Sequence, residues 1–199
     1  MSTFAGADPP DGATRIDEDE AADLLPPNIS TQAQLNEWEQ LNIAIAVEWL
    51  LGQKLTVAHV LSTDFACRLH QRMFDRTWRW AGTFRRSDKS IGLPWFDIQP
   101  LLKDLFDNTR AQLHTEAEST DEVAARLHHG LVFIHPFPNG NGRHARLLTD
   151  ALLTAIGQAP FSWGRKPLTA AGAPREEYIR ALKRADRGDF RELIEFVRS

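Results

Sequence analysis

Residues 135–146 read HPFPNGNGRHAR and bring together a histidine, a turn with two glycines, and two arginines. Gly140 and Gly142 lack a Cβ atom, so the turn can adopt positive φ angles and hold its backbone N–H groups close to a ligand. Apolar residues recur at helical spacing directly after the turn, which predicts a helix that ends near Gly157. The turn therefore presents its N–H groups at a helix N-terminus, where a phosphate binds favourably.

Two arginines follow this predicted anion site. Arg143 and Arg146 are three positions apart, so they occupy neighbouring places on the first turn of the helix. Cations at this end of a helix are unfavourable for the helix dipole, but they suit a ligand with several negative charges. The alternative for Arg143 and Arg146 is a structural ion pair with acidic residues of the chain.

A histidine precedes the same turn. A helix is predicted to begin at Ser119, which has the spacing of a capping box, and to end before Pro136. His135 then falls at its last turn, facing the anion site. A side chain with a pKa near neutrality at this place is a candidate general base, and the alternative is a buried structural histidine.

Composition limits the class of protein. A chain of 199 residues with 42% hydrophobic residues has enough material for one compact domain. Its net charge of −4 argues against direct nucleic-acid binding, and its single cysteine allows no internal disulfide. No secretory signal or apolar run of about 18 residues is apparent, so we expect a cytoplasmic protein without a membrane partner.

Two segments depart from a regular helical pattern. Residues 1–29 are rich in Asp, Glu, Pro and Gly, which predicts a mobile acidic segment before a domain at 30–199. Residues 83–98, TFRRSDKSIGLPWFDI, favour an exposed hairpin or extended loop whose edge could pair with another chain. Helical spacing elsewhere predicts an all-α domain with helices over 31–51, from Thr56 to Met73, and over 99–117.

The quoted stretch resembles the signature of the Fic family, His-x-Phe-x-(Asp/Glu)-Gly-Asn-Gly-Arg-x-x-Arg, at every fixed position except Asn139. Residues 74–86, FDRTWRWAGTFRR, resemble the family's Trp-Ala-Gly-x-x-Arg segment, and residues 175–190 resemble its C-terminal helices. The resemblance covers residues 35–199 and includes the branch catalogued as mobile mystery protein B. It implies a Fic-type helical domain with one short β-hairpin flap.

The resemblance also implies an activity, the transfer of AMP from ATP to a Ser, Thr or Tyr hydroxyl of a target protein. In that interpretation His135 takes the proton of the hydroxyl, and the flap around Ile91 aligns the target. Arg146 is expected near the γ-phosphate, and Phe137 packs inward to fix the loop. The residues implied to bind the nucleotide phosphates are Gly140, Asn141, Gly142, Arg143 and Arg146.

Asn139 is the one departure from the signature. The family holds Mg²⁺ with an acidic residue at this position, whereas Asn139 offers a neutral oxygen. The donor and the rate therefore stay open. The alternatives are another nucleotide-dependent phosphotransferase, or a catalytically weak nucleotide-binding module that acts with an antitoxin or regulatory protein.

Many Fic proteins carry an inhibitory helix, Ser/Thr-x-x-x-Glu-Gly/Asn, whose glutamate pairs with the second arginine of the signature. The chain holds no full match to this pattern. Glu18, Glu37 and Glu39 are the candidates, and we predict that one of them lies near Arg146. The alternative is that all three are ordinary solvated acids.

Overall fold

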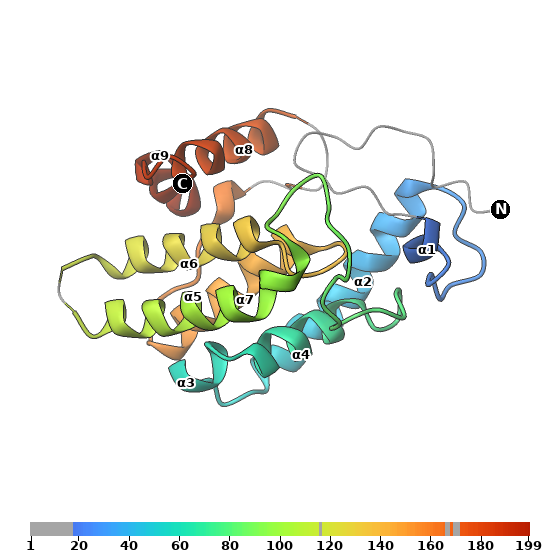
Figure 1. Ribbon diagram of the computed structural model, residues 1–199, viewed down its shortest axis with the longest axis horizontal. Coiled ribbons are helices and arrows are strands. Elements are labelled where there is room, and N and C mark those ends of the chain that lie inside the picture. Colours follow the sequence, from blue (N-terminus) through green and yellow to red (C-terminus); the bar gives the residue numbers. More distant parts are fainter. Residues whose placement is uncertain (1–17, 116, 166–167, 169–171) are drawn as a thin grey trace.

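The computed structural model describes residues 18–115, 117–165, 168 and 172–199. In these residues the chain folds into helices joined by loops, with no β-strand, which confirms the all-α prediction (Figure 1). The helices are α1 (Glu18–Ala21), α2 (Gln32–Leu51), α3 (Val57–Val60), α4 (Thr63–Phe74), α5 (Ile98–Leu113), α6 (Thr120–Ile134), α7 (Asn141–Ala155), α8 (Ala173–Ala185) and α9 (Arg191–Arg198). Single 3₁₀ turns occupy Trp95–Asp97 and Trp163–Arg165.

Helix starts follow the predicted caps, with one difference. Thr31 forms a full capping box with Gln34, and Ser119 Oγ accepts a hydrogen bond from the backbone of α6. The single helix predicted from Thr56 to Met73 is instead divided into α3 and α4. Ser62 caps the N-terminus of α4, so the predicted helix is interrupted there and a second helix begins at Thr63.

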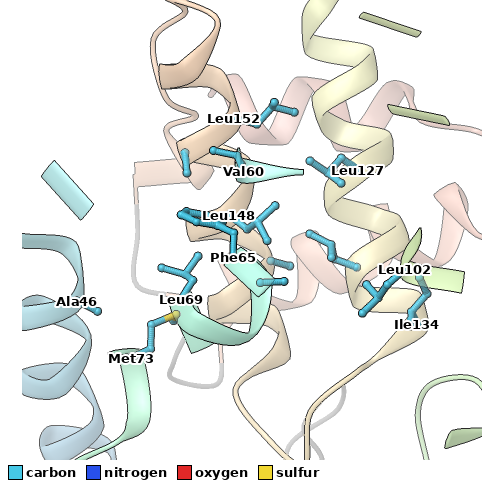
Figure 2. Packing of buried hydrophobic residues seen from close by; sticks show 14 of the residues in the cluster. Ala46, Val60, Phe65, Leu69, Met73, Leu102, Leu127, Ile134, Leu148 and Leu152 are labelled. Atoms are coloured by element: carbon cyan, nitrogen blue, oxygen red, sulfur yellow. The ribbon is translucent and has the colours of Figure 1, made fainter. Parts of the chain in front are cut away.

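The core is built from facing apolar stripes of α2, α4, α5, α6 and α7 (Figure 2). Figure 2 shows Leu69 and Met73 of α4 turned toward the layer that Leu127 and Leu148 help to form. A second cluster joins α8 and α9 to the outer faces of α6 and α7. In the view of Figure 1, α8 and α9 lie on the opposite side of α6 and α7 from α3 and α4. The helices α6 and α7, which flank the signature loop, are thus packed on both sides.

The segment between α4 and α5 does not form the predicted hairpin. Its backbone is hydrogen-bonded to the end of α6 at two places: Arg85 N donates to Pro136 O (3.0 Å), and Leu93 N donates to Ile134 O (3.5 Å). The buried guanidinium of Arg85 also donates to the carbonyl oxygens of Ser87 and Leu93. We call residues 83–94 the flap; it is a loop held against α6 instead of a pair of strands.

The N-terminal segment is described from residue 18, so residues 1–17 of the predicted mobile segment lie outside the described residues. The part that is described packs on the domain. Arg79 N donates to Asp23 O (3.0 Å), and Lys89 Nζ of the flap lies 2.6 Å from Glu20 Oε1. The side chains of Lys89 and Glu20 are 3% and 14% exposed, so this ion pair is largely shielded from solvent.

None of the described helices is both long and apolar enough to span a lipid bilayer.

Candidate active site

His135 ends α6 in an unusual backbone conformation. Its φ and ψ angles are 56° and 60°, the left-handed region that non-glycine residues adopt infrequently, and its N–H closes the helix on Leu131 O (3.1 Å). Arg85 Nε donates to His135 O (2.6 Å) and helps to hold this conformation. A Cβ atom on Gly92 would lie 2.5 Å from His135 Cβ, so the flap passes His135 at a distance that only glycine permits.

The surroundings of His135 fix its chemical form. Its Nδ1 lies 3.3 Å from Val132 O, and because a carbonyl only accepts, Nδ1 carries the proton and the lone pair is on Nε2. Burial lowers the pKa of His135 to about 4, with smaller contributions in the same direction from Arg85 and Lys89. The imidazole is therefore neutral at pH 7, which is the form that accepts a proton.

The signature loop is held from inside by Asn141. Its side chain accepts from Phe137 N (2.9 Å) and donates to Phe137 O (2.8 Å), so this amide closes the loop and does not face a ligand. Gly140 has a φ of 77°, and a Cβ atom there would lie 2.5 Å from Phe74. The first helical bond of α7 runs from His144 N to Gly140 O (2.9 Å). The N–H groups before it, in the first turn of α7, precede the helical ladder and suit an anion.

Phe137 is buried beneath this loop, as predicted, and His70 of α4 lies against it. The two rings stack with their centroids 3.8 Å apart. His70 Nδ1 accepts from Gly82 N (3.0 Å), so Nε2 carries the proton and donates to Asn139 O (3.0 Å). His70 thereby ties the loop to the turn that follows Trp80. Sequence reasoning missed this role because His70 belongs to no motif and only its place on the apolar face of α4 pointed inward.

Asn139 uses its own side chain within the loop. Its Oδ1 accepts from Gly140 N (2.5 Å), so one N–H of the turn is already bonded. No group of three His, Cys, Asp or Glu side chains suited to a metal ion occurs in the part of the chain that the structure describes. The loop thus offers a divalent ion one neutral oxygen, and such an ion would be held mainly by the phosphates of a nucleotide.

The two signature arginines have different partners. Arg143 Nη1 lies 2.8 Å from Glu39 Oε2, and the other carboxylate oxygen of Glu39 accepts from Trp78 Nε1 (2.8 Å). Glu39 is therefore a buried acid at the first arginine, and not at Arg146 as predicted. Glu37 is exposed on the other side of α2, and the side chain of Glu18 lies outside the described part of the structure.

Ile91 is half-buried in the flap, one residue before the contact of Gly92 with His135. Trp78 and Trp80 are buried in the core with their rings 4.9 Å apart, which leaves no exposed face for stacking a base.

We expect the protein to lose stability as the pH falls from 6.5 to 4. Burial lowers the pKa of His128 to about 3 and those of His135 and His144 to about 4, and it also lowers the pKa of His70. The unfolded chain therefore binds protons at these histidines at a higher pH than the native state does. The free energy of unfolding falls as the pH drops below the ordinary histidine pKa of about 6.5. Asp150 opposes this, because burial raises its pKa to about 6 and its protonation favours the native state.

With four histidines opposed by one aspartate, the unfolded chain binds up to three more protons than the native state, so the free energy of unfolding should fall by at most about 4 kcal/mol per pH unit within this window. Urea unfolding at pH 7, 6 and 5 measures it. A constant unfolding midpoint across that range would show that these histidines are accessible to solvent in the native protein.

Comparison with known proteins agrees with this site. Residues 60–153, from the end of α3 to the end of α7, match the model of the Fic/DOC family. A relative named protein adenylyltransferase Fic, from Nematostella vectensis, is 42% identical over 76 residues, which is 38% of this chain and 16% of that protein. Residues 60–153 of this chain are therefore similar to the Fic/DOC family.

Solved structures show the same fold. Fic-1 from C. elegans matches with a TM-score of 0.64 and 27% identity over 88% of this chain and 51% of that one. An N-terminal Fic domain from Bartonella quintana, solved with bound ADP, matches with a TM-score of 0.65 and 21% identity over 86% of each chain. The chain thus spans about half of the solved Fic-1 chain and a much smaller part of the curated relative above.

Proposed function

We propose that this chain transfers AMP from ATP to a hydroxyl group of a target protein. The observation that carries the proposal is the geometry of His135, a neutral imidazole with its lone pair on Nε2 directly before a loop of helix N-terminal N–H groups. The naming of the Nematostella vectensis relative as a protein adenylyltransferase supports it, as does the ADP bound to the Bartonella quintana domain.

In the proposed reaction His135 Nε2 takes the proton from the attacking hydroxyl. The hydroxyl oxygen forms a bond to the α-phosphorus while the bond from that phosphorus to the bridging oxygen breaks, and pyrophosphate leaves. The N–H groups of Gly142 and Arg143 and the guanidinium of Arg146 stabilise the negative charge on the phosphates. Magnesium bound with the nucleotide would neutralise part of the same charge, with the Asn139 oxygen as its one protein ligand.

We propose that the flap aligns the target protein. Gly92 touches His135, so a segment lying along residues around Ile91 would bring its hydroxyl to the imidazole. The target and any antitoxin or regulatory partner would meet the chain on this side. A cytoplasmic location would supply the ATP that the reaction needs.

A weakly catalytic nucleotide-binding module is the second candidate. It is favoured by Asn139, which lacks the charge of the usual metal ligand, and by the pairing of Arg143 with Glu39. Incubation with ATP, followed by mass spectrometry of the chain and of candidate target proteins, tests the two. A nucleotide adduct that requires His135 supports the transferase, and ATP binding without an adduct supports the module.

Glu39→Gln should increase ATP affinity and the rate of transfer by about 10-fold. The reason is that Glu39 competes with phosphate for Arg143, and a hydrogen bond to a charged group contributes roughly 1.5 to 3 kcal/mol. Glutamine still accepts from Trp78 Nε1, so the core contact is kept. Calorimetric titration of ATP and the rate of self-modification measure the change.

Glu37→Gln is the matched control, because it removes the same charge from the exposed side of α2 two residues away. If Glu39→Gln lowers the melting temperature without strengthening ATP binding, the Glu39–Arg143 pair is structural and has no inhibitory role.

A further inference from the structure

Arg146 has a neutral partner where Arg143 has a carboxylate. Its guanidinium lies over the ring of Tyr178, 5.9 Å from the ring centroid, and burial lowers its pKa while the neighbouring Tyr178 side chain and Asp150 act in the opposite direction. Among the described residues no carboxylate lies within ion-pair distance of Arg146. Asp150, one turn along α7, is instead bonded by Trp163 Nε1 (2.9 Å) and Phe161 N (3.1 Å).

Tyr178 is held by a second buried residue. Its hydroxyl lies 2.8 Å from His128 Nε2, and both side chains are removed from solvent. Burial lowers the pKa of His128 to about 3, so the ring is neutral at pH 7. Its Nδ1 lies toward the carbonyl of Ala145, short of good hydrogen-bond geometry. A carbonyl only accepts, so this arrangement places the proton on Nδ1 and the lone pair on Nε2.

The direction of the hydrogen bonds follows from that tautomer. His128 Nε2 accepts, so the Tyr178 hydroxyl donates its proton to His128 and directs its own lone pairs elsewhere. Arg146 lies against the same tyrosine, and its guanidinium can only donate, so it is the group suited to one of those lone pairs. We infer a sequence of donors from Arg146 to Tyr178 to His128, which would link α7, α8 and α6.

This arrangement has a chemical advantage for an arginine that binds phosphate. A carboxylate would fix the guanidinium equally well, but it would also cancel its charge and compete with the ligand. A hydroxyl fixes the direction of the side chain and leaves the full positive charge for an incoming anion. Ordering the side chain beforehand also reduces the entropy lost on binding.

We propose that Tyr178 and His128 are positioning residues that aim the Arg146 guanidinium at the outermost phosphate of ATP. The inference rests on the proposed nucleotide site and adds two residues from outside the signature loop. It predicts that their effect grows with the number of phosphates on the ligand.

Tyr178→Phe tests the inference, since it keeps the aromatic ring over Arg146 and removes only the hydroxyl. We expect the dissociation constant of ATP to rise by about 10-fold and that of AMP to change by less than about twofold. Equal weakening of ATP and AMP would mean a general structural role, and no change for either would overturn the inference. In an Arg146→Ala background Tyr178→Phe should have no further effect on ATP, because the tyrosine acts through the arginine.

Two substitutions at His128 give a matched pair. The glutamine amide reaches the position of Nε2, so His128→Gln should still accept from Tyr178 and keep ATP affinity near that of the native protein. His128→Leu has no acceptor and should weaken ATP binding as Tyr178→Phe does. Equal ATP affinity in the two variants would contradict the proposed order of hydrogen bonds.

A spectroscopic measurement separates failure of this inference from failure of the proposed function. Tyr178 is the only tyrosine of the chain, so protein labelled with ¹³Cζ-tyrosine gives one resonance that reports on this hydroxyl. ATP should shift it more than AMP does. Native protein that does not bind ATP would refute the proposed nucleotide site itself, whereas binding without any shift or any effect of Tyr178→Phe would refute only the role of Tyr178.

Discussion

His135→Ala is expected to lower the rate of transfer by roughly 10²- to 10⁴-fold, the usual contribution of a general base, while ATP binding is largely kept. The imidazole has its lone pair on Nε2 and is neutral because burial lowers its pKa to about 4. His135 precedes the loop and is not one of the residues whose backbone N–H groups would bind the phosphates. Initial rates and calorimetric titration of ATP measure the two quantities separately.

A second substitution removes the main ambiguity of this experiment. His135 has a φ of 56°, so alanine could disturb the backbone as well as remove the base. Asparagine adopts the left-handed region more readily than alanine, and it supplies no basic nitrogen. His135→Asn should therefore lose transfer as completely as His135→Ala. Parallel loss of transfer and ATP binding in both variants would identify His135 as a structural residue.

Asn139→Asp is expected to lower the Mg²⁺ concentration needed for half-maximal transfer, by a factor of roughly 5 to 150. The factor corresponds to about 1 to 3 kcal/mol, the difference between a charged and a neutral contact. Aspartate keeps an oxygen for Gly140 N, to which Asn139 Oδ1 is now bonded, so the loop should retain its shape. A Mg²⁺ titration of the transfer rate of both proteins measures the effect.

Asn139→Ala provides the control, because it removes both the metal oxygen and the acceptor for Gly140 N. It should be less active than the native protein at every Mg²⁺ concentration. If Asn139→Asp is also less active throughout the titration, the added charge repels the phosphates, and the loop is suited to another donor or to a site without a tight metal ion.

Much of the fold was predictable because it depends on local signals. The caps at Thr31 and Ser119 and the apolar periodicity of α6 and α7 specify helices without reference to the rest of the chain. The place of His135 at the end of α6 followed from Pro136. The loop before α7 followed from its glycines, and the burial of Phe137 from the resemblance to the Fic family.

The features that were not predicted depend on contacts between distant segments. The residues of the flap favoured a hairpin or an extended loop, and the resemblance to the Fic family implied the hairpin. The segment is a loop because the Arg85 guanidinium and the carbonyls at the end of α6 take the bonds that a partner strand would need. Glu39 meets Arg143 across 104 positions of sequence, from 39 to 143, and no spacing rule indicates that pair. Helical spacing likewise gives no sign that Tyr178 bridges His128 and Arg146.

The central claim is that AMP, and not another part of the nucleotide, moves to the acceptor. The most direct test compares the native protein and His135→Asn after incubation with ATP labelled at the α-phosphate or at the γ-phosphate, using covalently bound label as the readout. The account predicts that native protein transfers label from the α-phosphate only and that His135→Asn transfers neither. Label transferred from the γ-phosphate would contradict it and identify a kinase-like phosphotransferase.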